Sequence, residues 1–558
     1  MTATSVEDTA AHKGTPVATA IDALTLEQAA FAAVEQGNLA LAELAYLKLV
    51  TAAPSADALA NLFEVAAARN NYHLTQRALE TLIEVEPNNV QAFERLAEVR
   101  GATGDTAGAV EALRRALLIE PHNAALAAWH AIWSQGVLER FHEVPDLLLK
   151  AAELDEDGSQ LEQIVDALIY HRRYADAEHF IGVFQEKTGS LHPTMLRLLG
   201  VALAGQDRIE EAREVFGVAI DSCDSVLDEK APSDDLWRRM DDAEYHRVCE
   251  LYAFRARLEH EAGRTSSALG TYAILRAGAV ARGLAYPDSL VPDAAERLAD
   301  LRALIGGRDL VLLCHGHSVK DFAARIGELG GRHPVFASLN RFGVIEHEVL
   351  APAKRGLDVV VELAPGGIRR NRNHLKRFLH QPRRTMAIVS PAAINAAFEP
   401  EERDAFVAIN HHRLLPVTSN ALHSVTPDDP LSLLQESTLL AALPALVAAQ
   451  PRRIFVIGGE HRLRDGEAGS HLGIRSPHFT ARGVGDFVTD GNDAQARANF
   501  DLALQHNATV TDRNLAFQIA AVATLHGFDA PPVFNVAPDS RLQSLPKITL
   551  DDFFAMVG

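Results

Sequence analysis

The sequence predicts an all-helical repeat half followed by an α/β half built on a mostly parallel, doubly wound sheet. Two observations predict this division. In the amino-terminal half, small residues, large apolar residues and prolines recur at a spacing near 34 residues. Beyond the prolines at 287 and 292, short unbroken apolar runs alternate with amphipathic helical stretches. The fold class is therefore a helical solenoid joined to an α/β domain.

Composition limits the function classes. The 558 residues exceed one ordinary core, and 47% apolar with 23% charged residues is typical of globular proteins. The sequence contains no uncharged apolar run of about 18 residues, so we expect no membrane span. The first twenty residues lack the pattern of a signal peptide. Cys223, Cys249 and Cys314 have no metal-binding spacing and suit a reducing cytoplasm. A net charge of -21 argues against nucleic-acid binding.

The repeat half begins after a small, polar stretch, residues 1–20, that we expect to be a disordered tail. Two copies share a glycine, an alanine, a large side chain and a proline: Gly37, Ala42, Tyr46, Pro54 and Gly104, Ala109, Leu113, Pro121. A weaker copy lies between them, with Asn70, Leu79 and Pro87. Degenerate copies follow in RRYADAEHFIGVF, DRIEEAREVFGVA and AGRTSSALGTYAIL, and a unit near 139–155 fits by length.

This pattern resembles the tetratricopeptide repeat, in which small residues let two antiparallel helices approach and a proline ends the second one. The resemblance implies about seven helical pairs within a protein-binding domain over residues 21–285. Such a stack has a concave groove that holds an extended peptide or a partner helix. The alternative is that the solenoid mediates self-association.

The α/β half follows a linker over residues 286–300 and occupies residues 301–558. Its strand candidates are short apolar runs, namely Leu310–Cys314, Val335–Leu339, Asp358–Leu363, Thr385–Ser390, Leu415–Thr418, Arg453–Ile457 and Pro532–Val536. Helical stretches separate them, which favours a Rossmann-like, mostly parallel sheet.

The stretch RDLVLLCHGHSVKDFAARI carries the first candidate site. A strand ends near Cys314, and Ser318 with Asp321 predicts a capping box that starts a helix. The intervening loop, His315, Gly316 and His317, therefore joins a strand to a helix amino end, where unpaired N–H groups attract anions. This predicts a phosphate or nucleotide site, and the alternative is an ordinary turn with solvated histidines.

Polar residues follow several other strands of the predicted sheet. Asn340, Glu362 and Asn420 come after the second, third and fifth strands, and Gly458-Gly459-Glu460-His461 follows the sixth. Because the carboxyl ends of parallel strands share one edge, we expect these groups to converge. Near them the stretch 369–384 holds seven basic residues, which suits either an anionic donor or a solvated helix face.

The order of five blocks carries a family resemblance: CHGHSVKDF, SLN, SNALHS, RIFVIGGEHRLRDGEAGSHLG and VFNVAPDSRLQSLPKITLDDFF. It is similar to the family that contains bacterial motility accessory factors and archaeal hydroxymethylpterin diphosphokinase. Joined to tetratricopeptide repeats, the chain resembles flagellin-modifying glycosyltransferases of flagellated, motile bacteria. Three positions depart from the family pattern: His317 replaces a proline, Val319 a leucine and Glu460 an aspartate.

The resemblance implies a cytoplasmic protein O-glycosyltransferase. Its repeats would bind flagellin, and its α/β half would transfer a nonulosonic acid of the pseudaminic or legionaminic type from a CMP-sugar to Ser or Thr. The donor would be a substrate, with no separate cofactor and no metal, because a monophosphate leaving group has no diphosphate to chelate.

The predicted site has two sets of residues. The donor would contact His315, Gly316, His317, Ser318, Asn340, Asn420, Gly458 and Gly459, which offer backbone N–H groups, imidazoles and amides. The acceptor hydroxyl would need a base, for which the candidates are Glu460, His461, His471 and Asp465.

Two alternatives stay open at this point. A pterin or nucleotide diphosphokinase on the same scaffold would need Mg²⁺ and ATP, but it would leave a peptide-binding solenoid unexplained. A non-catalytic repeat adaptor with a degenerate nucleotide-binding domain is the other alternative, which the departures at His317 and Glu460 keep open.

Overall fold

A computed structural model describes residues 16–227, 232–282, 294–314, 316–339, 343, 345–363, 385–390, 394–395, 397–416, 438–460 and 494–557. The chain divides into two compact units, residues 1–99 and 100–558. Among the described helices, none combines the length and the apolar character needed to cross a membrane.

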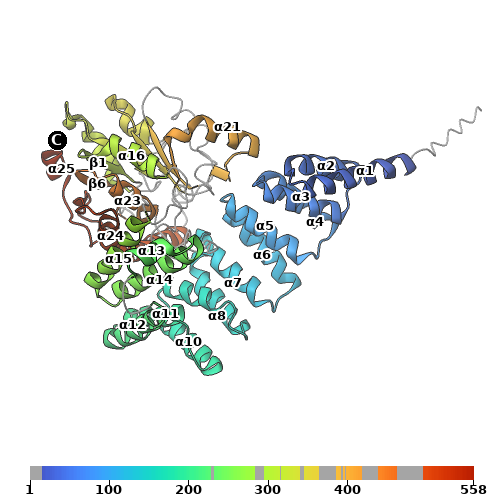
Figure 1. Cartoon of the computed structure of the whole chain (residues 1–558), viewed down its shortest axis with the longest axis horizontal. Coiled ribbons are helices and arrows are strands. Elements are labelled where there is room, and N and C mark those ends of the chain that lie inside the picture. The colour runs from blue at the N-terminus through green and yellow to red at the C-terminus, as the bar shows by residue number, and fades with distance from the viewer. Residues whose placement is uncertain are drawn as a thin grey trace, which may run out of the picture. The chain divides into compact units, whose positions relative to one another are not determined.

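Helical pairs fill the amino-terminal half, as the repeat spacing predicts (Figure 1). In the described residues, seven pairs follow one another: α1 (Pro16–Glu35) and α2 (Leu39–Ala52), α3 (Ala56–Ala68) and α4 (Tyr72–Val85), α5 (Val90–Ala102) and α6 (Thr106–Ile119), α7 (Ala124–Ser134) and α8 (Val144–Leu154), α9 (Leu161–Tyr170) and α10 (Tyr174–Thr188), α11 (Pro193–Gly205) and α12 (Ile209–Asp224), α14 (Asp242–Glu261) and α15 (Thr265–Ala281). The short helix η1 (Leu138–Glu143) lies between α7 and α8, and α13 (Asp234–Arg239) lies between α12 and α14.

A left-handed residue in the turn within a pair recurs in six of these pairs. The residues and their φ angles are Gly37 at 71°, Asn70 at 56°, Gly104 at 79°, Arg172 at 59°, Asp207 at 62° and Gly263 at 76°. Glycine and asparagine accept this backbone conformation most readily. The first three pairs add a side-chain cap to the second helix, from Asn38, Asn71 and Asp105. Arg173, Arg208 and Arg264 stand at that position later and make no side-chain cap.

The sheet contains all seven predicted strands, with small changes at their ends. They are β1 (Asp309–Leu313), β2 (Val335–Leu339), β3 (Val359–Glu362), β4 (Met386–Val389), β5 (Leu414–Pro416), β6 (Arg453–Ile457) and β7 (Val533–Asn535). Every pairing between them is parallel, and the spatial order is β5-β4-β3-β2-β1-β6-β7.

Helices connect and cover these strands. They are α16 (Ala294–Ile305), α17 (Ser318–Arg325), η2 (Ile326–Leu329), the π-helical turn η3 (Ile345–Leu350), η4 (Ala351–Ala353), α21 (Pro400–Asn410), η5 (His411–Arg413), α23 (Thr438–Ala448), α24 (Ala494–His526) and α25 (Leu550–Met556). The predicted linker 286–300 is described only from residue 294, where α16 begins.

Alternate residues of β1 enter two separate apolar clusters. Leu310 and Leu312 belong to one apolar cluster with residues of α16, α23, α24 and the repeat helices α14 and α15. Val311 and Leu313 pack with α17 and α25 on the opposite side. Because successive strand residues point to opposite faces, these clusters lie on the two faces of the sheet. The last repeat pair therefore shares a core with the sheet.

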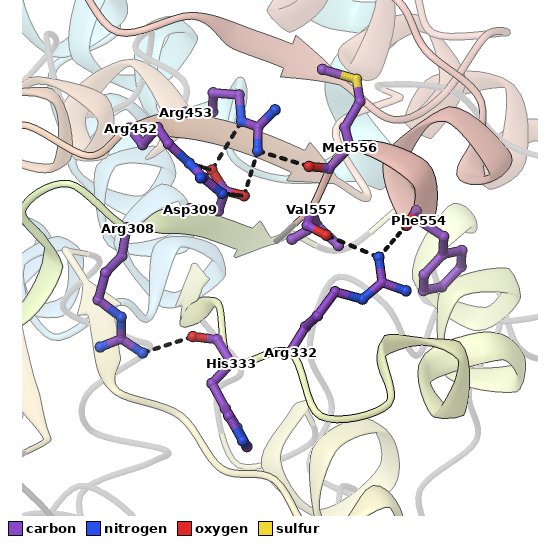
Figure 2. Close-up of polar contacts among 9 residues, drawn as sticks. All are labelled: Arg308, Asp309, Arg332, His333, Arg452, Arg453, Phe554, Met556 and Val557. Atoms are coloured by element: carbon purple, nitrogen blue, oxygen red, sulfur yellow. Dashed lines mark hydrogen bonds and ion pairs between the residues drawn. The ribbon is translucent and has the colours of Figure 1, made fainter.

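At the amino edge of the sheet, arginine side chains contact a buried carboxylate and backbone carbonyls (Figure 2). Asp309 is fully buried and accepts from Arg452 at 2.9 and 2.6 Å and from Arg453 at 2.9 and 2.7 Å. Arg453 also donates to the carbonyl of Met556 at 2.8 Å, and Arg332 donates to the carbonyls of Phe554 and Val557. These contacts hold α25 against the start of β6 and the segment that precedes β2.

The start of α17 differs from the predicted capping box. Ser318 is the first helical residue, His317 precedes it, and no local side chain caps the helix. The N–H of Ser318 instead donates to the carboxylate of Glu460, 142 residues later in the chain. A capping-box prediction uses neighbouring residues alone, so it cannot register a carboxylate that tertiary structure brings to the same N–H group.

Candidate functional site

The candidate site lies where the order of the strands reverses. The chain adds β2 to β5 on one side of β1 and then returns to place β6 and β7 on the other side. In open α/β sheets the crevice at the carboxyl ends of the strands beside such a reversal is the usual ligand site. The loops that follow β1 and β6 meet at this position, and so does the loop that follows β7.

Gly316 and Gly458 allow the backbones of the loops after β1 and β6 to approach each other closely. The ladder continues past the strand ends, since Cys314 N–H donates to Ile457 O and Gly316 N–H to Gly458 O, both at 2.7 Å. Gly458 has a φ of 84°, which favours glycine. A methyl group at Gly458 would also press on the side chain of Val319. The glycines predicted to cradle a phosphate therefore bring two backbones together.

Glu460 lies at this close approach of the two loops. Its side chain is fully buried, and Oε1 accepts the N–H of Ser318 at 2.9 Å. Ser318 Oγ in turn accepts the N–H of Gly458 at 2.9 Å. The carboxyl group of Glu460 thus occupies the amino end of α17, where the helix dipole favours an anion.

The second oxygen of Glu460 has no such support. Oε2 is buried and makes no hydrogen bond within the described residues. It lies against Gly316, at which any side chain would overlap it. Burial raises the pKa of Glu460, and the hydrogen bond from Ser318 and the nearby His317 oppose that rise in part. The pKa of the Cys314 thiol is raised by burial and by the charge of Glu460.

His317 connects this buried carboxylate with the surface. Its side chain is 6% exposed, and Nε2 lies 3.2 Å from Asp539 Oδ2, on a side chain that is 50% exposed. Its Nδ1 is buried and lacks a hydrogen-bond partner among the residues the structure describes. Buried polar atoms are nearly always paired, so two unpaired atoms in one cluster mark a place where a ligand or water adds the missing partner.

The loop after β7 supplies supporting residues. Ser540 Oγ donates to Gly459 O at 3.1 Å and accepts from Asn535 Nδ2 at 2.8 Å. The N–H of Arg541 donates to Glu460 O at 3.0 Å. Asn535, Asp539 and Ser540 are site residues that the sequence motifs did not predict. Their position just after the seventh predicted strand, at the same sheet edge, was the available signal.

The structure brings together Gly316, His317, Ser318, Gly458, Gly459 and Glu460 of the predicted site. The other predicted residues lie outside the described residues: His315, Asn340, Asn420, His461, Asp465, His471 and the basic stretch 369–384. The roles of these undescribed residues stay predictions. Glu362, which is described, is fully buried at the end of β3. Within the described residues, no group of three or more His, Cys, Asp or Glu side chains is arranged to hold a metal ion.

Comparisons with known proteins found distant structural likenesses and no family. No protein-family model matches the chain, and no curated protein matches it. Among solved structures, a tetratricopeptide repeat protein from Parabacteroides merdae is 13% identical, with a TM-score of 0.32 over 48% of this chain and 96% of that one. MamA is 15% identical, with a TM-score of 0.23 over 38% and 99%.

The pilF protein of Pseudomonas aeruginosa is 16% identical, with a TM-score of 0.28 over 38% of this chain and 93% of its own. Likenesses this distant carry no functional argument. The repeat architecture rests on the helical pairs and left-handed turns of this chain itself.

Proposed function

We propose that the protein is a repeat-guided transferase: the helical pairs bind a protein, and the carboxyl edge of the sheet binds an activated, anionic donor. The specific form implied by the family resemblance is transfer of a nonulosonic acid from a CMP-sugar to Ser or Thr of flagellin, on a Rossmann-like, doubly wound sheet. One observation carries the proposal. The amino end of α17, His317 and Glu460 meet at the strand-order reversal, and each of the two side chains has a buried atom without a hydrogen-bond partner among the described residues.

The chemistry of this cluster suits a departing phosphate. A donor oxygen that replaced the Glu460 carboxylate at the N–H of Ser318 would gain a helix amino end, and the imidazole of His317 lies beside it. The displaced Glu460 would then be a carboxylate beside the donor, as a general base requires. In the structure described, Glu460 caps α17, so donor binding and base action both require its side chain to move.

The position of Glu460 also favours a second candidate. If the carboxylate remains at the amino end of α17, it occupies the position that a donor phosphate would need. The α/β half would then be catalytically inactive, and the protein would act as a repeat adaptor. The same resemblance admits a diphosphokinase, which would need Mg²⁺ and ATP for turnover.

The test is intact-mass measurement of flagellin co-expressed with the full-length chain and a CMP-nonulosonate supply. The proposal expects a mass increase with the wild type. It expects a loss of about 10²–10⁴-fold in transfer rate with Glu460→Gln, which keeps the hydrogen bond to Ser318 but accepts no proton. Asp551→Asn is the control, because that carboxylate is exposed on α25.

The outcomes separate the candidates. Unmodified flagellin that co-purifies with the wild type would support the adaptor. Wild-type turnover in Glu460→Gln at saturating donor would move the base to His461, His471 or Asp465. Loss of donor affinity with unchanged turnover would make Glu460 a binding residue.

A further inference from the structure

The helix α24 packs against the repeats, although it belongs to the carboxyl-terminal half of the sequence (Figure 1). It contacts η1, which follows α7, and α15 of the last pair, as well as α23 beside the sheet. It therefore joins elements from the two halves within residues 100–558.

The first contact is an aromatic cluster around two histidines. His506 of α24 lies 5.5 Å from His171, 5.5 Å from Tyr170 and 5.7 Å from Phe141, between ring centroids. Burial lowers the pKa of His171 to about 3 and that of His506 to about 4, so both rings are neutral near pH 7. Neutral buried rings let α24 pack on the turns of the repeats as an apolar surface.

The second contact lies about three turns further along α24. Phe517 stacks on His260 of α14 at 3.8 Å between centroids, with 5° between the rings, and also meets Tyr272 of α15. Past the end of the helix, Gly527 has a φ of 71° and lies against the guanidinium of Arg276. Together the two contacts hold α24 along the repeat pairs from η1 to α15.

The same helix holds the loop after β7. Asp501 of α24 accepts from Arg541 Nη2 at 2.9 Å. Asp512, three turns later, accepts the backbone N–H groups of Gln543 and Ser544 at 2.5 and 2.6 Å. Hydrogen bonds to a charged acceptor are among the stronger ones in proteins. Two carboxylates of α24 therefore set the position of residues 541–544.

That loop also reaches the candidate site. Asp539 contacts His317, Ser540 holds the carbonyl of Gly459, and Arg541 donates to the carbonyl of Glu460. A continuous set of contacts thus runs from the repeat helices through α24 and residues 539–544 to the amino end of α17.

We propose that Asp501 and Asp512 of α24 are positioning residues, through which the docked repeat helices hold residues 539–544 and thereby the His317–Glu460 site in place. The repeat half is then a structural part of the site as well as a separate binding surface. A protein that binds the repeats and shifts α24 would change the site. That the coupled site binds a donor rests on the proposed function; the coupling itself does not.

The test is hydrogen exchange of the full-length chain, measured by mass spectrometry without donor or acceptor. Asp512→Ala removes the acceptor for two backbone N–H groups, whereas Asp512→Asn keeps an oxygen at the same place. We expect Asp512→Ala to speed exchange of the site N–H groups of Gly316, Ser318 and Gly458 about tenfold or more, and Asp512→Asn to restore much of the protection. These amides do not touch Asp512.

A variant at the far contact extends the test. Phe517→Ala should also speed exchange at Gly316, Ser318 and Gly458, because it loosens α24 from the repeats. Phe216→Ala is the matched control: Phe216, like Phe517, is a buried phenylalanine, and it lies on α12 in a repeat cluster that contains no α24 residue.

Unchanged exchange at the site in both Asp512→Ala and Phe517→Ala would overturn the proposal, as would an equal change in Phe216→Ala. Neither result depends on transfer activity. Coupled exchange without any flagellin modification would retain this inference and reject the transferase.

Discussion

Two buried carboxylates mark the opposite edges of the same pair of strands, and they differ in how completely they are paired. Asp309, at the amino edge, is fully buried and receives four hydrogen bonds from Arg452 and Arg453 (Figure 2). Glu460, just past the carboxyl edge of β6, is equally buried, yet Oε2 has no hydrogen bond within the described residues.

The difference separates a structural edge from a candidate site. Removing a carboxylate from water is costly unless its oxygens are hydrogen-bonded and its charge is paired. At Asp309 two guanidinium groups supply both. At Glu460 one backbone N–H and the α17 dipole supply only part of this, and one carboxyl oxygen has no hydrogen bond within the described residues.

The largest expected effect is at the amino edge. Asp309→Ala leaves Arg452 and Arg453 facing each other without a carboxylate. We expect the free energy of unfolding to fall by about 3 kcal/mol, the lower end for a broken buried pair, because Arg452 is half exposed. Urea unfolding followed by circular dichroism measures this. Asp551→Ala, whose carboxylate is exposed beside Arg325, should cost below about 1 kcal/mol. A similar small loss in Asp309→Ala would contradict the comparison.

The second prediction concerns space beside Glu460. Gly316→Ala places a methyl group where Oε2 lies, so it should destabilise the fold by about 1–3 kcal/mol. In a Glu460→Ala background the same substitution should cost at least about 1 kcal/mol less, because the obstructing carboxyl is gone. The double-mutant cycle is measured by urea unfolding at one pH. Equal costs in the two backgrounds would show that the carboxyl does not restrict position 316.

The smallest effect is a pH dependence. Burial raises the pKa of Glu460 above its usual 4.5, so the folded chain retains a proton that the unfolded chain loses. The stability this provides is fully present below about pH 4.5 and is lost as pH rises through the folded-state pKa, by at most about 1.4 kcal/mol per pH unit.

Glu460→Gln should remove that loss, because glutamine does not titrate. The measurement is the urea midpoint of wild type and variant at several pH values from 4.5 to 8. Glu210→Gln, at an exposed position of α12, is the control. Parallel curves for wild type and Glu460→Gln would show that this carboxyl does not titrate differently on folding.

The repeat half shows how far local signals reach. Glycine or asparagine in the turn and a proline after the second helix identify the first three copies in the sequence, because each residue acts on its own backbone. The structure adds an Asn or Asp side-chain cap to each of these copies. The later copies place Arg172 and Asp207 in the left-handed turn and arginines at the cap. There the helical pairs persist through packing against their neighbours, so the local signal is weak.

Apolar patterning predicts the seven strands, a mostly parallel sheet and the meeting of the loops after β1 and β6, because strand runs are visible in the sequence and parallel strands end at one edge. Which atoms meet there depends on the tertiary structure. Glu460 and Ser318 are 142 positions apart, and His506 of α24 reaches His171 of the repeats. Such pairs depend on backbone approach within a few ångströms and on competition between distant partners for one N–H group, which no local pattern encodes.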